Sequence, residues 1–146
     1  MKVTSYGWDT HGDHFNGAAS LHPKLDTPLA AILDDLAERS MLNDVLVIVA
    51  AEFGRTPRIN GHLGRDHWPE AWSVAMAGRG IKGGAVVGKT NDKGTDVATD
   101  PFDIGSLFHT WFTALGLNSK KAKHWNADQP LPAAHEDMKP IKELLA

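Results

Sequence analysis

Val45-Leu-Val-Ile-Val-Ala-Ala-Glu-Phe-Gly-Arg-Thr-Pro-Arg58 is the stretch that decides the fold we predict from this sequence. Residues 45–51 are all apolar and rich in β-branched side chains, and the run is too short for a buried helix. We therefore predict a strand covered on both faces, as in parallel sheets. The apolar run stops at Glu52, and the turn that follows carries Arg55. Carboxylate and guanidinium are thus expected at the sheet edge where open α/β folds bind ligands.

The segment before this strand predicts an amphipathic helix. Apolar residues recur at helical spacing, opposite acidic ones, at Leu25, Leu29, Ile32, Leu33 and Leu36. The helix is expected to start at Thr27-Pro28 or, one turn earlier, at Pro23. A strand-like segment, Lys2–Tyr6, precedes it, and strand–helix–strand is the unit that builds right-handed parallel crossovers. The predicted fold class is α/β, a three-layer αβα arrangement with a mostly parallel sheet.

The remainder of the chain predicts two further strands, a second helix and a tail. We expect strands over 72–77 and 85–89, a helix over 104–115 that Gly116 closes in a left-handed cap, and an irregular tail over 118–146. The loop over 54–70 is too long for a plain connection, and loops of this length are usually functional or disordered. We expect one domain, residues 1–146.

Composition narrows the class of protein. The chain has 146 residues, of which 42% are hydrophobic and 23% charged, as in ordinary globular proteins. Its formal net charge of -3 provides no basic surface for nucleic acid. The sequence contains no run of about 18 apolar residues, so it predicts no membrane-spanning helix. The chain contains no cysteine, which excludes disulfides and thiolate metal sites, but it contains eight histidines.

Acidic residues and histidines gather in three clusters, each next to a predicted strand. The clusters are Asp9, His11, Asp13 and His14; then Glu52 with Arg55; then His62, Asp66 and His67. Carboxylates with imidazoles are the ligands of zinc, manganese or iron. Because loops at the same edge of an α/β sheet converge, we predict a shared metal site there.

Each cluster also has a structural interpretation, and the residues alone leave it open. Asp9 can accept hydrogen bonds from turn amides while His11 stays in solvent. Glu52 and Arg55 can form a local surface ion pair of roughly 0–1 kcal/mol. His67 beside Trp68 can be a packed, hydrogen-bonded histidine.

Four strings together resemble the bacterial family known as domain of unknown function fifteen-oh-one. They are Gly-Trp-Asp-Thr-His (7–11), Val-Leu-Val-Ile-Val-Ala-Ala-Glu-Phe-Gly-Arg-Thr-Pro (45–57), Gly-Arg-Asp-His-Trp-Pro (64–69) and Gly-Arg-Gly-Ile-Lys-Gly-Gly (78–84). The similarity extends over nearly the whole chain. That family looks like a branch of the alkaline phosphatase and sulfatase superfamily, and the resemblance implies a partial alkaline-phosphatase-like fold.

The resemblance also implies a ligand set for a divalent metal ion, with zinc, manganese and calcium as candidates. By this resemblance Asp9, His11, Glu52 and His67 hold the metal, and Asp13, His14 and Asp66 are weaker candidates. Arg55 would steady the anionic substrate. This chain departs from the superfamily pattern at Phe53, which stands where a ligand histidine is expected.

The hypothesis that follows is metal-dependent hydrolysis of a small-molecule phosphate or sulfate ester. The resemblance implies that the chain is the carboxyl-terminal half of such a domain. It would then have its nucleophile upstream and, like larger family members, would be exported or periplasmic. Two alternatives remain: a non-catalytic binding module on the same fold, or a truncated gene product without independent function. An open sheet edge in such a fragment is expected to favour self-association.

Overall fold

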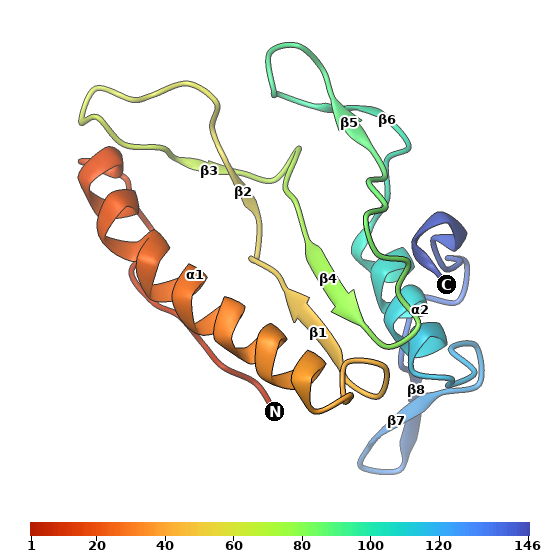
Figure 1. Ribbon diagram of the computed structural model, residues 1–146. Coiled ribbons are helices and arrows are strands. Elements are labelled where there is room, and N and C mark those ends of the chain that lie inside the picture. The colour runs from red at the N-terminus through yellow and green to blue at the C-terminus, as the bar shows by residue number, and fades with distance from the viewer. The chain divides into compact units, whose positions relative to one another are not determined.

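The computed structural model describes residues 1–146, which form two compact units. Unit 1 comprises Met1–Ser40, Ala50–Val74 and Thr90–Val97; unit 2 comprises Met41–Val49, Ala75–Lys89 and Ala98–Ala146. Figure 1 labels the helices and strands of both units.

The long helix of unit 1, α1, spans His14–Glu38 (Figure 1). It begins well before both expected starts and continues through Pro23 and Pro28, each of which removes one backbone donor. The N–H of His14, which has no partner within the helix, donates instead to the carbonyl of Leu63 at 2.9 Å. The helix start is therefore held by another part of unit 1.

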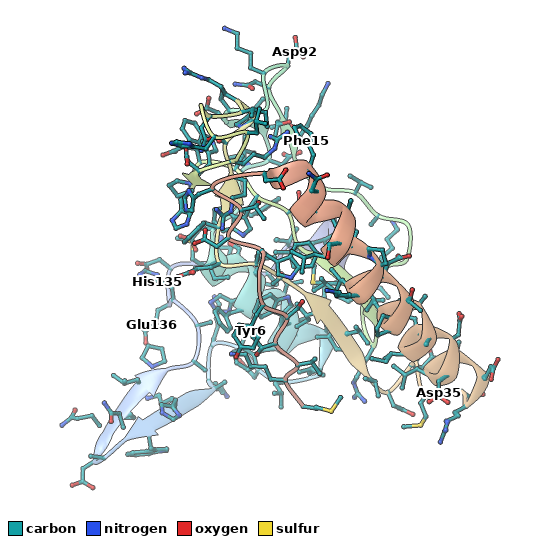
Figure 2. The ribbon with its side chains drawn as sticks, turned by 90° about the vertical axis from the view of Figure 1, so that its left-hand side faces the viewer. Tyr6, Phe15, Asp35, Asp92, His135 and Glu136 are labelled. Carbon is teal, nitrogen blue, oxygen red and sulfur yellow. The ribbon has the colours of Figure 1, made fainter.

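The segment before α1 is not a strand. Residues 2–6, expected to be strand-like, have no partner strand. The chain instead runs back along the helix, where the rings of Trp8 and His22 lie 5.7 Å apart. Tyr6 stands on this segment with 81% of its surface exposed (Figure 2). The predicted strand–helix–strand unit thus lacks its first strand.

Unit 1 also contains a short antiparallel pair, β2 (Gly54–Arg55) with β3 (His67–Trp68). In this register Gly54 lies opposite Trp68, and Arg55 lies opposite His67. Position 54 requires glycine, because a Cβ there would lie 2.0 Å from the carbonyl oxygen of Ala71. The pair therefore places Arg55 and His67 next to each other.

The decisive strand of the sequence, β1 (Leu46–Val49), belongs to unit 2 and pairs with β4 (Ala75–Gly78). The two strands are antiparallel, with Leu46 opposite Gly78 and Val49 opposite Ala75. Their residues are half-buried or exposed, not enclosed on both faces. A strand buried on both faces was therefore a wrong prediction.

The predicted fold class is also wrong. The structure has two helices and four separate two-stranded sheets, so it has no large parallel sheet and no three-layer αβα arrangement. Three of the four pairs, among them β1 with β4 and β2 with β3, are antiparallel. The remaining sheet pairs β5 (Lys89–Thr90) with β6 (Val97–Thr99). The physical reason is that an apolar run indicates a strand but does not specify the direction of its partner.

The second helix, α2 (Ile104–Ala114), has well-defined ends. Asp103 caps its start by accepting a hydrogen bond from the N–H of Gly105. At its end Gly116 has a φ of 78°, and the N–H of Leu117 donates to the carbonyl of Phe112 at 2.8 Å. This is the left-handed cap predicted from the sequence, which is confirmed. Neither α1 nor α2 is both long and apolar enough to span a bilayer.

The core of unit 2 lies between α2 and the chain that follows it. Within 118–146, expected to be an irregular tail, the elements are β7 (Lys123–Asn126), β8 (Gln129–Pro132) and the 3-10 turn Lys142–Leu144. The fully buried His109 and Thr110 hold this segment. His109 Nε2 lies 2.8 Å from the carbonyl of His135, and Thr110 Oγ1 accepts from the N–H of Ile141 at 2.9 Å.

Candidate metal centre

Main-chain pairing within unit 1 brings residues 9–11 to residues 66–67. The segment 10–14 runs antiparallel to the loop 62–65, with a β-bridge between Gly12 and Leu63. Three hydrogen bonds continue this pairing: Asp13 N–H to His62 O at 3.0 Å, His14 N–H to Leu63 O at 2.9 Å, and Arg65 N–H to Thr10 O at 3.0 Å. Two clusters that are far apart in the sequence therefore meet.

The pairing depends on a glycine at position 64. A Cβ there would lie 2.0 Å from both the carbonyl carbon and the carbonyl oxygen of His11. Only hydrogen fits at this distance, so Gly64 lets the two main chains approach closely. His11 owes its position to this contact.

Asp9, His11 and His67 form a group of three ligand atoms. Asp9 Oδ1 lies 2.9 Å from His67 Nε2 and 3.0 Å from His11 Nε2, and the two imidazole nitrogens are 3.2 Å apart. All three side chains are about half exposed. The group is therefore open to a ligand from solvent.

The imidazole of His11 has a defined orientation and tautomer. Its Nδ1 lies 2.8 Å from Asp66 Oδ1. Hydrogen bonds from His11 and then Asn60 hold the pKa of Asp66 below its usual range, so this carboxylate is ionised at neutral pH and only accepts. His11 Nδ1 must therefore carry the proton, which leaves a lone pair on Nε2 when the ring is neutral.

Arg55 contacts the same oxygen of Asp9 as the two histidines. Its Nη2 lies 2.6 Å from Asp9 Oδ1, and its Nη1 donates to the carbonyl of Arg65 at 3.3 Å. The hydrogen bond from His67, followed by that from Arg55, lowers the pKa of Asp9 to about 2. Asp9 is therefore an anion at any physiological pH.

Lone pairs of Asp9 and His11 face each other as a result. A carboxylate oxygen and the unprotonated nitrogen of a neutral imidazole, 3.0 Å apart, repel unless a cation lies between them. The cation can be a proton on His11 Nε2 or a metal ion bound by both atoms. For bonds of about 2.0–2.1 Å, ligand atoms on one ion are separated by about 2.9–3.4 Å, the range that this group shows.

Aromatic rings line the His67 side of the group. The Phe53 ring centroid lies 4.3 Å from that of His67, and Arg55 Cζ lies 5.9 Å from the Phe53 centroid. The next residue, Trp68, donates from Nε1 to the carbonyl of Thr95 at 2.7 Å. His67 thus packs against the Phe53 ring and precedes an anchored tryptophan.

Not every residue proposed from the sequence joins this group. Glu52 is exposed and lies outside the group of three, and the partner of Arg55 is Asp9. Asp13 precedes α1 and accepts from Asn16, while His14 Nδ1 lies 2.7 Å from Thr10 Oγ1. Burial, followed by repulsion from Arg65, lowers the pKa of His14. Both side chains have local roles at the helix start.

Asp66 and Asn60 lie outside the group of three and form hydrogen bonds with His11. Asp66 contacts His11 through Nδ1, which is the side of the ring opposite the shared Asp9 oxygen. Asn60 was not a candidate from the sequence. The Asn-Gly pair at 60–61 signals a turn, but a turn signal does not reveal which distant side chain it contacts.

Comparison with known proteins identifies the family of the chain. The model of the family described as "Protein of unknown function (DUF1501)" matches residues 1–145, so the chain belongs to this family. A search of curated proteins found no match, and a search of solved structures found none either.

Proposed function

We propose that this member of the DUF1501 family binds a divalent metal ion through Asp9, His11 and His67 and takes part in hydrolysis of a phosphate or sulfate ester. The observation that carries the proposal is the meeting of Asp9 Oδ1, His11 Nε2 and His67 Nε2 at separations of 2.9–3.2 Å, the spacing of ligand atoms around one metal ion. The ester chemistry rests on the resemblance of the sequence motifs to the alkaline phosphatase and sulfatase superfamily.

Among zinc, manganese and calcium, zinc fits the donor set best. Two imidazole nitrogens and one carboxylate oxygen are a common ligand set of catalytic zinc, with further positions left for water or substrate. Calcium prefers oxygen ligands alone, six to eight of them. Glu52 is not part of this ligand set, because it lies outside the group.

Each side chain of the proposed centre would have its own role in binding the metal ion or the substrate anion. When bound, the metal ion would polarise an oxygen of the phosphoryl or sulfuryl group. Arg55 places a permanent positive charge next to Asp9 and is suited to bind a further oxygen of the same anion. Asp66 holds the Nδ1 proton of His11, so that Nε2 stays available as a donor atom.

Metal-dependent binding without turnover is the second candidate function. The Phe53 ring favours it, because this ring lies tilted against His67 at a centroid distance of 4.3 Å and presents an apolar surface where another polar group would stand in a two-metal site. Such a centre would recognise an anion through the ion and Arg55 and then release it unchanged.

The proposal is tested by metal titration and then by turnover. The metal-free chain is titrated with Zn²⁺, Mn²⁺ and Ca²⁺ by calorimetry, together with His67→Ala and the matched control His62→Ala. His62 lies in the same loop, but its imidazole is not in the group. We expect one zinc site that His67→Ala weakens and His62→Ala leaves unchanged; equal binding by all three proteins contradicts the site.

Turnover separates the two candidate functions. A larger, zinc-loaded family member and its variant with alanine at the position that matches His67 are assayed with p-nitrophenyl phosphate and p-nitrophenyl sulfate. Hydrolysis that disappears in this variant supports the hydrolase. Zinc binding together with binding of inorganic phosphate or sulfate, but no hydrolysis of either ester, selects the binding function.

A further inference from the structure

Asn60 lies at the centre of the hydrogen bonds that surround His11. Its Nδ2 donates to the carbonyl of His11 at 3.0 Å and to Asp66 Oδ1 at 2.9 Å. Its Oδ1 accepts from the N–H of His62 at 2.9 Å and from the N–H of Gly64 at 2.9 Å. Every donor and acceptor of this amide is used, and the partners allow only one orientation of its two ends.

These bonds form a closed ring of contacts. Asn60 holds the main chain of His11 and the carboxylate of Asp66, and Asp66 holds the ring of His11 at Nδ1. The position of the imidazole relative to its own backbone is thereby fixed from both ends. Two side chains, His11 and Asn60, form hydrogen bonds with the Asp66 carboxylate. Without the Asn60 amide, only His11 remains.

We infer that Asn60 is the positioning residue of the proposed metal centre: it aims the Asp66 carboxylate at His11 Nδ1, and this holds a proton at Nδ1 so that Nε2 is the nitrogen directed at the ion. The part of this inference that concerns metal affinity rests on the proposed function. The part that concerns the tautomer of His11 does not. Outer-shell partners of this kind typically change metal affinity by about 10–100-fold when they are removed.

The substitution Asn60→Asp isolates the donor role. The carboxylate keeps an oxygen for the N–H groups of His62 and Gly64, but it replaces the Nδ2 donor with an acceptor that faces Asp66. The added negative charge would by itself attract a cation. A fall in zinc affinity therefore reports the loss of positioning, because electrostatic attraction acts in the opposite direction.

Unit 1 provides a matched control at Asn91. This amide builds the same kind of loop: its Oδ1 accepts from the N–H of Lys93 and of Thr95, and its Nδ2 donates to Thr95 Oγ1 and to Asp96. It contacts none of the three ligands. The neighbouring Asp92 stands at the tip of this loop (Figure 2). Asn91→Asp therefore carries the same charge and the same loss of a donor to a carboxylate, away from His11.

The experiment has two readouts on the whole chain. The first is the ¹⁵N spectrum of the histidine rings without metal at pH of about 8, above the range in which free imidazole titrates. His11 is identified as the signal missing from His11→Ala. We expect a protonated Nδ1 in the wild type and in Asn91→Asp, and loss of that proton to Nε2 in Asn60→Asp. The second readout is zinc affinity, expected to fall about 10–100-fold in Asn60→Asp alone.

The outcomes separate this inference from the proposed function. If the wild type binds no zinc, the proposed function fails while the His11 tautomer still decides the role of Asn60. If Nδ1 stays protonated in Asn60→Asp, or changes equally in Asn91→Asp, the inference is overturned. Should Asn60→Asp not fold, Asn60→Ala removes the Nδ2 donor together with the Oδ1 acceptor, and the same comparison applies with Asn91→Ala as its control.

Discussion

Replacing Gly64 by alanine should separate His11 from Asp9 and His67 in the proposed metal centre. The added Cβ would lie 2.0 Å from the carbonyl carbon and oxygen of His11, whereas real Cβ contacts begin at 3.0–3.4 Å. The two main chains must therefore move apart by about 1.0–1.4 Å at this contact. Both neighbours are backbone, so no side chain can turn aside to make room.

This displacement is large compared with the tolerance of a metal site, which is about 0.5 Å. We expect His11 to be lost as a ligand. Zinc-finger peptides bind zinc with about 10–16 kcal/mol through four ligands, or roughly 2.5–4 kcal/mol for each. The zinc affinity of Gly64→Ala should accordingly fall about 10²–10³-fold. Overpacking of the loop should also lower the free energy of unfolding by about 1–3 kcal/mol.

The matched control is Gly61→Ala in the same loop, where an added Cβ meets open space and φ is not positive. Calorimetric zinc titration and urea unfolding are measured on both variants. The argument fails if Gly64→Ala, while folded, binds zinc as tightly as Gly61→Ala. It also fails if both variants lose affinity equally, because the loss would then not come from the contact with His11.

Three further predictions concern pH, helix α2 and metal removal. The pKa of Asp9 is about 2 in the folded chain, below its ordinary value of 3.8, so its stabilisation is complete above pH of about 5 and is lost as pH falls toward about 2. Urea unfolding over this range should be less pH-dependent in Asp9→Asn. Gly116→Ala, at φ 78°, should lower the free energy of unfolding by about 1–2 kcal/mol, while Gly83→Ala, in open space, should not. Zinc at 100 times its Kd should raise the free energy of unfolding by about 2.7 kcal/mol, an effect that EDTA reverses; a melting temperature indifferent to both additions argues against a site in the folded chain.

Helix α2 shows how much a local pattern can determine. Apolar spacing and the following Gly116 predict both the helix and its left-handed end, because a helix and its cap depend on residues within a few positions of each other. The same logic fails for α1, because Pro23 and Pro28 predict helix starts whereas the helix runs through both. A proline lowers helix stability but does not forbid a helix whose start is anchored elsewhere.

The candidate site was predictable only in its residue types. The sequence by itself determined that carboxylates and imidazoles stand next to predicted strands, and the family resemblance named Asp9, His11, Glu52 and His67 as ligands. Only the tertiary structure decided that these three meet, that Glu52 does not join them, and that Asn60 and Asp66 stand behind His11.

The physical reason is the same for the sheet and for the site. Periodicity encodes the conformation of a segment, whereas the direction of strand pairing depends on which distant backbone supplies the hydrogen bonds. β1 is a strand as expected, but its partner β4 runs antiparallel to it. In the group of Asp9, His11 and His67, the close approach at Gly64 selects which segments meet, and no pattern within either segment records that contact.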